Sequence, residues 1–220
     1  MPSEPRGRVD KSSPHRRPLA RSRKISARLA ASYPGSATEL CALAHHNPFE
    51  LLVATILSAQ CTDERVNMVM PALFKRYATP ADFAGAKREE LEDLIRSTGF
   101  FRSKASHIIG ACEAIVLRHA GEVPDTIEEL TALPGVGRKT ANVVLSVAFG
   151  LPGLPVDTHV TRLSKDPVKI EEDLCGLFPP EDWGAISLRL ILHGRRVCVA
   201  RRPRCEVCEL SDLCPSRGKF

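Results

Sequence analysis

Two residues, Lys139 and Asp157, have side-chain types and positions that suit catalysis. Lys139 lies in the first turn of an expected helix, where the positive end of the helix disfavours a protonated amine. An unprotonated amine can attack a sugar carbon or a carbonyl-like centre, so we expect Lys139 to be a nucleophile. Asp157 follows 18 positions later and opens another helical stretch. Singly, the two would be interpreted as a surface lysine and a helix cap; together, at this spacing, they favour a catalytic pair.

A glycine-rich turn directly precedes the lysine, in the run LPGVGRKT. Gly135 and Gly137 allow a tight turn that presents backbone N–H groups to an anion, and the helix that begins near Arg138 adds its positive end. Before the turn we expect a short helix, capped by Asp125 and ending at Thr131. The unit is therefore predicted to be helix, hairpin and helix, and to grip a phosphate backbone without reading its sequence.

The remaining chain is expected to be helical as well, because helical spacing recurs and the alternation typical of strands does not persist. One helix, 49–59, is apolar on nearly all sides, which places it at the centre of a domain. It follows Asn47 and Pro48, a cap and a proline that suit a helix start. Pro71 is expected to kink or break a helix over 66–77. Other helices are expected at 25–33, 37–44, 87–97, 103–119, 158–165 and from Asp166 to Phe178.

Composition limits the class of protein. A chain of 220 residues can form one or two domains with a real core. The net charge of +5 is uneven: residues 1–24 hold eight basic and two acidic residues, a net of +6, which leaves −1 for the rest. We expect this segment to be a disordered basic tail that touches phosphates without specificity. It lacks the apolar core of a secretory signal, and its prolines oppose a mitochondrial presequence. No apolar run approaches the roughly 20 residues of a membrane helix.

Eight cysteines fall into two groups. Four are scattered through helical patterns and are expected to be small buried hydrophobic residues: Cys41, Cys61, Cys112 and Cys175. Four others, spaced C-x6-C-x2-C-x5-C, indicate a metal site rather than disulfides: Cys198, Cys205, Cys208 and Cys214. Zinc competes with an iron–sulfur cluster for four thiolates, although structural zinc sites usually have two close pairs and this run has one. In either case the metal is expected to stabilise a segment with few apolar residues.

Five arginines surround the first of these four cysteines, with no acidic residue among them: Arg195, Arg196, Arg201, Arg202 and Arg204. A solvated loop is the ordinary interpretation of such a run. A metal would hold the loop rigid, however, so Arg201 and Arg202 could contact phosphates at a low entropic cost.

Together these features resemble the endonuclease III family of DNA base-excision glycosylases. The resemblance is carried by LPGVGRKTANVV (133–144), VDTH (156–159) and the four-cysteine tail, and it covers residues 25–214. It implies that Lys139 attacks C1′ of a damaged nucleotide and that Asp157 assists. It also implies a four-iron, four-sulfur (4Fe-4S) cluster at the cysteines. The chain is several residues shorter than usual in the family after the helix that follows Asp157, near Lys165.

The same resemblance implies how DNA is held. Gln60, in the LSAQ-x-TD motif, would project into the duplex and fill the gap left by the damaged base, and Phe100 would be an apolar wedge. Since adjacent phenylalanines often plug a core, we expect at least one of Phe100 and Phe101 to be buried. The expected contacts to the DNA backbone are Gly135, Gly137, Arg138, Arg201 and Arg202.

The implied architecture is two helical domains that flank a DNA-binding cleft. We expect a helix-hairpin-helix domain over 41–151 and a cluster domain formed by 25–40 with 152–220. Lys139 would face the cleft from the first and Asp157 from the second.

The implied function is a bifunctional base-excision repair enzyme. It would flip out and remove oxidised pyrimidines such as thymine glycol, then nick the abasic site by β-elimination through a Schiff base to Lys139. Its partner would be double-stranded DNA with a damaged base; we expect no membrane partner, a monomer, and an intracellular, cytoplasmic location at the bacterial nucleoid. Two alternatives remain: a glycosylase for mismatched thymine or uracil, and a DNA-binding module without catalysis.

Overall fold

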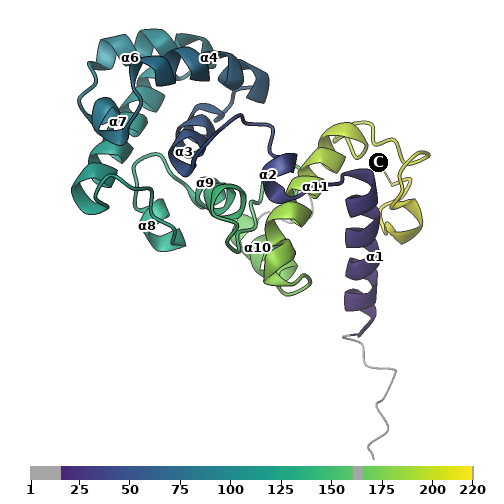
Figure 1. Ribbon diagram of the computed structural model, residues 1–220. Helices are drawn as coiled ribbons and strands as arrows, with labels where there is room; N and C mark the ends of the chain where they lie inside the picture. The colour runs from purple at the N-terminus through teal and green to yellow at the C-terminus, as the bar shows by residue number, and fades with distance from the viewer. Residues whose placement is uncertain (1–15, 161–165, 220) are drawn as a thin grey trace, which may run out of the picture.

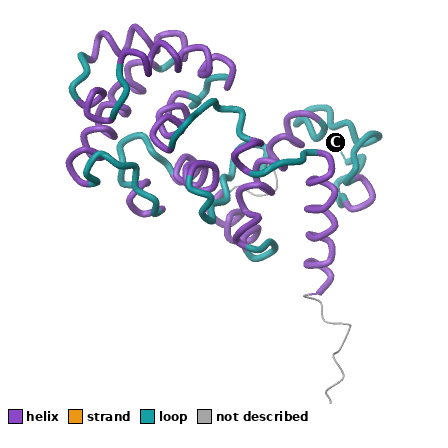
Figure 2. The backbone as a smooth tube through the Cα atoms, in the orientation of Figure 1, coloured by secondary structure: helices purple, strands orange, loops and turns teal. Residues whose placement is uncertain are grey.

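The computed structural model describes residues 16–160 and 166–219, and within them every regular element is a helix (Figures 1 and 2). The all-α prediction is confirmed. The α-helices are α1 (Arg16–Ser32), α2 (Ala37–Leu40), α3 (Pro48–Leu57), α4 (Asp63–Arg76), α5 (Pro80–Ala84), α6 (Arg88–Ile95), α7 (Phe101–Arg118), α8 (Ile127–Thr131), α9 (Arg138–Val143), α10 (Pro167–Cys175) and α11 (Trp183–Arg196). A π-helix, Val144–Ala148, continues α9, and short 3₁₀ turns lie at Arg96–Thr98, Pro180–Asp182 and Ser211–Leu213.

Helix α3 is the buried centre of the larger lobe, as its apolar sequence predicts. Asn47 caps it, since its side chain accepts a hydrogen bond from the Glu50 backbone N–H at 2.9 Å, and Pro48 occupies the first position. Eight of its ten residues are buried, and it packs against α4, α7, α9 and the π-helix. The helix ends at Leu57, two residues earlier than expected, so the loop that carries Gln60 begins there.

The buried hydrophobic residues form one large cluster and two small ones. The large cluster gathers residues between Leu43 and Val147. The small clusters belong to the other lobe, where α1 lies along α11 and the C-terminal loop (Figure 1); they are Leu154, Val156, Val160, Ile170 and Ile191, and Leu29, Tyr33 and Ile186. This grouping is compatible with the predicted division near residues 40 and 151, which stays a prediction.

The predicted disorder of residues 16–24 is wrong, because α1 already begins at Arg16. Its inner face contains Ser22 and Leu29, both buried, with Tyr33 just beyond its end. The Ser22 hydroxyl donates to the carbonyl of Leu177 at 3.3 Å, and α1 packs on α11. The surface that stabilises this helix is thus supplied by residues more than 150 positions away, which no local pattern reveals. Residues 1–15 of the predicted tail lie outside the described residues.

Four other local predictions need correction. The segment expected as a helix over 37–44 is helical only in α2, because the Asn67 side chain binds the backbone of Ala42 and Ala44 and holds it extended. Helix α8 is capped by Thr126, not Asp125. Helix α4 continues through Pro71, so the proline does not break the helix, and a kink at Pro71 stays a prediction. Of the helix expected over 158–165, residues 158–160 form a turn and the others lie outside the described part of the chain.

Candidate active site and nucleic-acid interface

The hairpin between α8 and α9 depends on Gly135. Its φ of +76° lies in the left-handed region, and a Cβ added there would be only 2.5 Å from the Cβ of His107 on α7. No other residue fits both conditions. The backbone N–H of Val136 closes the turn on the carbonyl of Leu133 at 3.1 Å. Gly135 therefore lets the hairpin pack directly on α7 while remaining exposed itself.

Gly137 has a different role from Gly135. It is the N-cap of α9 with an ordinary φ of −88°, and no atom lies within 4 Å of where its Cβ would be. The missing side chain instead leaves the first turn of α9 uncovered. The N–H groups at this end of the helix lack partners within the helix and suit an anion. A contact of Gly135 and Gly137 with DNA phosphates stays a prediction.

Lys139 is the second residue of α9 and is exposed, whereas the residues at the other side of the helix are buried. One of these, Asn142, donates from Nδ2 to the carbonyl of Leu154 at 3.3 Å. A Cβ on Gly153 would be 2.6 Å from the carbonyl oxygen of Asn142, so the connector packs directly on α9 at this glycine. The helix that presents Lys139 is thus in contact with the segment that leads to Asp157.

Asp157 is buried, with 7% of its surface exposed. Its Oδ1 accepts from the backbone N–H groups of His159 at 2.8 Å and Val160 at 3.2 Å, so the capping interpretation holds in the structure. None of the described residues donates to Oδ2. Helix α11 fixes this turn from behind: the Ser187 hydroxyl donates to the carbonyl of Pro155. One carboxylate oxygen therefore orients the group, and a catalytic role for the carboxylate stays a prediction.

Arg138 was predicted as a DNA contact, and the structure gives it a second role. Its Nε and Nη2 donate to the two carboxylate oxygens of Glu171 on α10, each at 2.8 Å. The hydrogen bond to Glu171 raises the pKa of Arg138. This bidentate pair joins α9 to α10 across 33 positions of sequence. Its contact with DNA stays a prediction.

Gln60 and Phe100 share an unusual backbone conformation. Their φ values are +54° and +48°, in the left-handed region that disfavours residues other than glycine. Both side chains are exposed, Phe100 by 66%, while the adjacent Phe101 is half-buried against the large cluster. Such strained residues concentrate at functional sites. The geometry distinguishes Phe100 as the candidate wedge and Phe101 as the packing residue.

The four C-terminal cysteines follow α11 in a loop of turns that α1 holds in place. Arg28 forms a bidentate salt bridge with Asp212 and donates to the carbonyl of Glu209 at 2.7 Å. Arg21 donates to the carbonyl of Leu213 at 2.5 Å. The N-terminal helix thus contributes arginines that hold the cysteine loop against the body of the protein.

The donor set of this loop fits an iron–sulfur cluster. All four thiols are free of disulfides. Burial raises the pKa of Cys208, and a backbone hydrogen bond from Leu210 opposes this shift. The nearby acidic groups raise the pKa of Cys208 further; they are Glu209, Cys198 and Cys214. No three His, Cys, Asp or Glu side chains among the described residues converge tightly enough for one metal ion. Four thiolates suit an iron–sulfur cluster, and they also suit a single zinc ion.

The scattered cysteines differ from the prediction in part, since Cys112 is buried but Cys41, Cys61 and Cys175 are half-buried. Burial raises the pKa of Cys112 to about 12 and is the main cause that raises the pKa of Cys175 to about 11. Thiolate, the reactive form, is therefore scarce at both.

Removal of iron from the holoprotein is expected to expose the cluster ligands to alkylation. Iodoacetamide at about pH 8 should then modify the four C-terminal thiols while Cys112 and Cys175 stay largely unmodified. With iron present, the C-terminal thiols should be protected. Mass spectrometry of the peptides, with an iron and zinc assay and an absorbance spectrum, measures both states. Equal labelling of the C-terminal thiols with and without metal would contradict their assignment as ligands.

The arginines around Cys198 separate into paired and unpaired residues. Arg195 forms a salt bridge to α4 at 2.8 Å, and Arg204 donates to the carbonyl of Arg196. Arg201 and Arg202 are exposed, and within the described residues no partner is recorded for either. They are therefore accessible from solvent, and their contact with a DNA phosphate stays a prediction.

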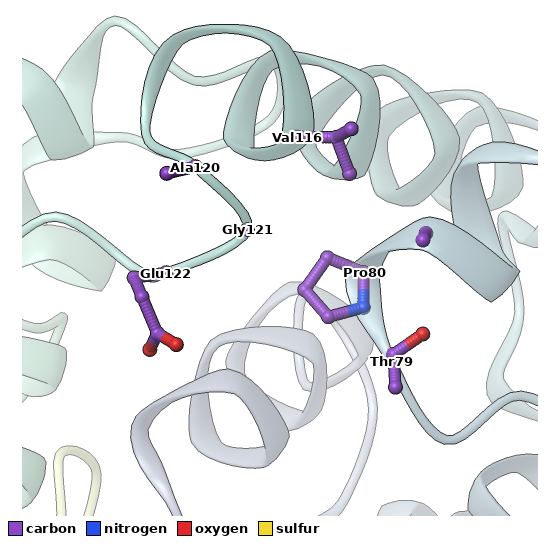
Figure 3. A pocket seen from close by; sticks show the side chains of 7 residues that line it. Thr79, Pro80, Val116, Ala120, Gly121 and Glu122 are labelled. Atoms are coloured by element: carbon purple, nitrogen blue, oxygen red, sulfur yellow. The ribbon is translucent and has the colours of Figure 1, made fainter.

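A surface depression of about 600 Å³ lies between the start of α5 and the end of α7 (Figure 3). Thr79 and Pro80 form one side, and Val116 and Glu122 are among the residues of the other. No predicted site residue lines it. The candidate site instead consists of the hairpin before α9, the Asp157 turn and the two loops that carry Gln60 and Phe100.

Sequence reasoning missed one residue beside these loops. Lys104, on α7, is only 3% exposed. No apolar pattern marks it, because it follows Arg102 and Ser103 in a polar stretch. Only the tertiary structure shows that its ammonium group lies inside the protein.

Comparison with known proteins identifies two matching families. Residues 53–173 match the HhH-GPD superfamily of base excision DNA repair proteins, and residues 198–214, from the first to the last C-terminal cysteine, match the iron-sulfur binding domain of endonuclease III. The iron–sulfur assignment of the four-cysteine loop is thereby confirmed over the zinc alternative.

Individual relatives agree with this assignment. The chain is 56% identical over 193 residues to an endonuclease III from Synechocystis sp. (84% of this chain, 87% of the relative). It is 42% identical over 204 residues to the endonuclease III of Escherichia coli K12 (89% of this chain, 95% of the relative).

Solved structures agree as well. A non-covalent endonuclease III–DNA complex and a trapped covalent endonuclease III–DNA intermediate each superpose with a TM-score of 0.84, at 43% and 44% identity, over 91% of this chain and 97% of theirs. A thermostable thymine-DNA glycosylase, at 20% identity and a TM-score of 0.80, shares the fold. The helix-hairpin-helix fold, the cysteine loop and these relatives show that the chain belongs to the endonuclease III family.

Proposed function

We propose that Lys139 and Asp157 carry out the reaction of this enzyme, a bifunctional DNA glycosylase with abasic-site lyase activity toward oxidised pyrimidines such as thymine glycol. One observation carries the proposal. The exposed Lys139 amine lies on α9, directly after the hairpin, and the inner side of α9 bonds to the segment that leads to the buried Asp157 carboxylate. A trapped covalent DNA intermediate is known for a relative, which supports an amine as nucleophile.

The chemistry follows from these two groups. The Lys139 amine attacks C1′ of the damaged nucleotide, and the bond from C1′ to the base breaks, so that the base leaves and takes up a proton. The attached nitrogen then loses a proton, the C1′–O4′ bond opens with O4′ taking up a proton, and C1′ and the nitrogen become the Schiff base. The buried Asp157 carboxylate would stabilise positive charge that develops in this step and would accept a proton. Loss of the C2′ proton and departure of the 3′ phosphate then cut the strand.

DNA would lie across the hairpin and the two strained loops. Gly135, Gly137 and Arg138 would hold phosphates near the lesion, and Gln60 and Phe100 would enter the base stack after the damaged base has flipped out. Arg201 and Arg202 would contact the backbone from the cluster loop. The cluster, when bound, would fix the fold of that loop; Cys198, Cys205, Cys208 and Cys214 would hold it.

We infer that the enzyme acts as a monomer on nucleoid DNA in the cytoplasm of a bacterium, since the relatives named above are bacterial proteins and the proposed substrate is double-stranded DNA. None of the described helices is both long and apolar enough to cross a bilayer. The domain division at 41–151, with 25–40 and 152–220 as the cluster domain, remains part of the proposal and is supported by the separate hydrophobic clusters.

Replacement of Arg201 and Arg202 by alanine is expected to weaken binding to damaged and intact duplex to a similar extent, because backbone contacts carry no sequence information. Each lost phosphate contact should also reduce the slope of log affinity against log salt by about 0.9. Fluorescence anisotropy at several salt concentrations measures both quantities.

A matched control changes the exposed residues Lys75 and Arg118 to alanine, with the same loss of charge outside the proposed interface. The control should bind DNA as the unmodified protein does. If both double variants weakened binding equally, general charge rather than contact by Arg201 and Arg202 would explain the effect.

A further inference from the structure

Lys104 has an environment that the proposed chemistry does not use. Its ammonium nitrogen donates to the carbonyl of Leu57 and to the carbonyl of Thr98, each at 2.7 Å. A buried charge is costly unless hydrogen bonds replace its water. Burial lowers the pKa of Lys104, and the neighbouring Cys61 opposes this shift.

The two acceptors of this lysine belong to two different loops. Leu57 is the last residue of α3, three positions before Gln60. Thr98 ends a 3₁₀ turn, two positions before Phe100. One ammonium group therefore bonds to the base of both loops that carry the predicted intercalating residues.

A cation is well suited to this position. Leu57 and Thr98 both end helical turns, where carbonyl groups lack partners within the helix and the backbone dipole is negative. An apolar side chain of similar length would fill the volume but leave two carbonyls without this donor. The choice of a lysine is thus explained by the two loop ends it joins.

The loops also need a constraint of this kind. Gln60 and Phe100 both have positive φ, and both point their side chains into solvent rather than into the core. Burial of these side chains therefore does not offset the backbone strain. Such a conformation persists where surrounding contacts fix it, and the bonds of Lys104 act on the backbone just before each residue.

We propose that Lys104 is a positioning residue that holds the Gln60 loop and the Phe100 loop at a fixed separation, so that both side chains enter the duplex together. This inference rests on the proposed function, in which these two residues occupy the DNA. It predicts that Lys104 affects base extrusion and excision through Gln60 and Phe100 and leaves the binding of undamaged duplex unchanged.

The test compares Lys104→Met with the unmodified holoenzyme in single-turnover excision from a thymine-glycol duplex. We expect the rate at saturating enzyme to fall by about 10- to 100-fold, because small misplacements of positioning groups have effects of this size. A duplex with 2-aminopurine opposite the lesion should show a smaller fluorescence change on binding, since Gln60 no longer enters the stack fully. Arg118→Met, with the same loss of charge at the exposed end of α7, should match the unmodified enzyme.

A double-mutant cycle separates positioning from a general loss of structure. In a Gln60→Ala/Phe100→Ala background, Lys104→Met should lower the rate by less than about twofold, because the groups it positions are absent. An equal loss in both backgrounds would overturn the proposal, as would an unmodified rate and fluorescence change in Lys104→Met. If Lys104→Met does not fold, Lys104→Gln, which keeps an N–H donor, takes its place in the cycle.

Failure of the proposed function gives a different result. In that case the unmodified enzyme would neither excise the lesion nor form an adduct. The fluorescence change on binding of a lesion duplex would still report whether the two loops enter DNA and whether Lys104 controls that step.

Discussion

Lys139→Ala is expected to form no borohydride-trapped adduct with an abasic or thymine-glycol duplex and to lose strand nicking by at least about 10³-fold. That loss corresponds to about 4 kcal/mol of transition-state stabilisation. The reason is that the variant lacks the only nucleophile proposed for C1′. Because Lys139 is exposed and alanine favours helices, stability should stay within about 0.5 kcal/mol. Gel analysis of trapped and nicked DNA measures the effect.

The matched control for this variant is Lys169→Ala, which removes an exposed lysine on α10 with no proposed role. It should trap and nick DNA at the unmodified level. Persistent trapping by Lys139→Ala would assign the nucleophile to another amine. Absence of trapping by the unmodified protein would favour a DNA-binding module or a hydrolytic glycosylase.

Asp157→Asn is expected to retain the fold and lower the rate of base excision by about 10²- to 10⁴-fold, the range typical of a lost acid–base group. The asparagine oxygen can still accept from the backbone N–H groups of His159 and Val160, so the cap that Asp157 makes is preserved. Single-turnover excision at saturating enzyme and thermal unfolding measure the two effects separately.

Asp157→Ala provides the comparison that isolates the charge. It removes both the carboxylate and the cap, so it should lose about 1 kcal/mol of stability in addition to activity. Similar excision by Asp157→Asn and the unmodified enzyme would limit Asp157 to its capping role and remove it from the catalytic pair.

Local sequence signals predicted the elements around the site where the cause is itself local. Asn47 and Pro48 mark the start of α3, and the glycine hairpin marks the start of α9 at Arg138. The exposure of Gln60 and Phe100 also agrees with the roles that the family resemblance implies. In these cases a cap or a turn requires particular residue types within a few positions.

The features that could not be predicted depend on contacts between distant segments. Helix α1 extends to Arg16 because α11 offers it a surface, and Arg138 pairs with Glu171 from another helix. The π-helix after α9 has no local signal, since its mostly apolar run, VLSVA, would suit an ordinary α-helix as well. Lys104 lies in a polar stretch and is buried only because α3 and the 3₁₀ turn end beside it. Each of these requires the relative positions of helices, which composition and periodicity do not contain.

The most direct test of the proposed mechanism is to locate the covalent bond to DNA. The unmodified holoenzyme is reduced with borohydride during reaction with a thymine-glycol duplex, digested, and the DNA-linked peptide is sequenced by mass spectrometry. The proposed mechanism predicts a deoxyribose remnant on the side-chain nitrogen of Lys139 and on no other amine. A remnant on any other lysine or on the N-terminal amine would contradict the assignment of Lys139 as nucleophile.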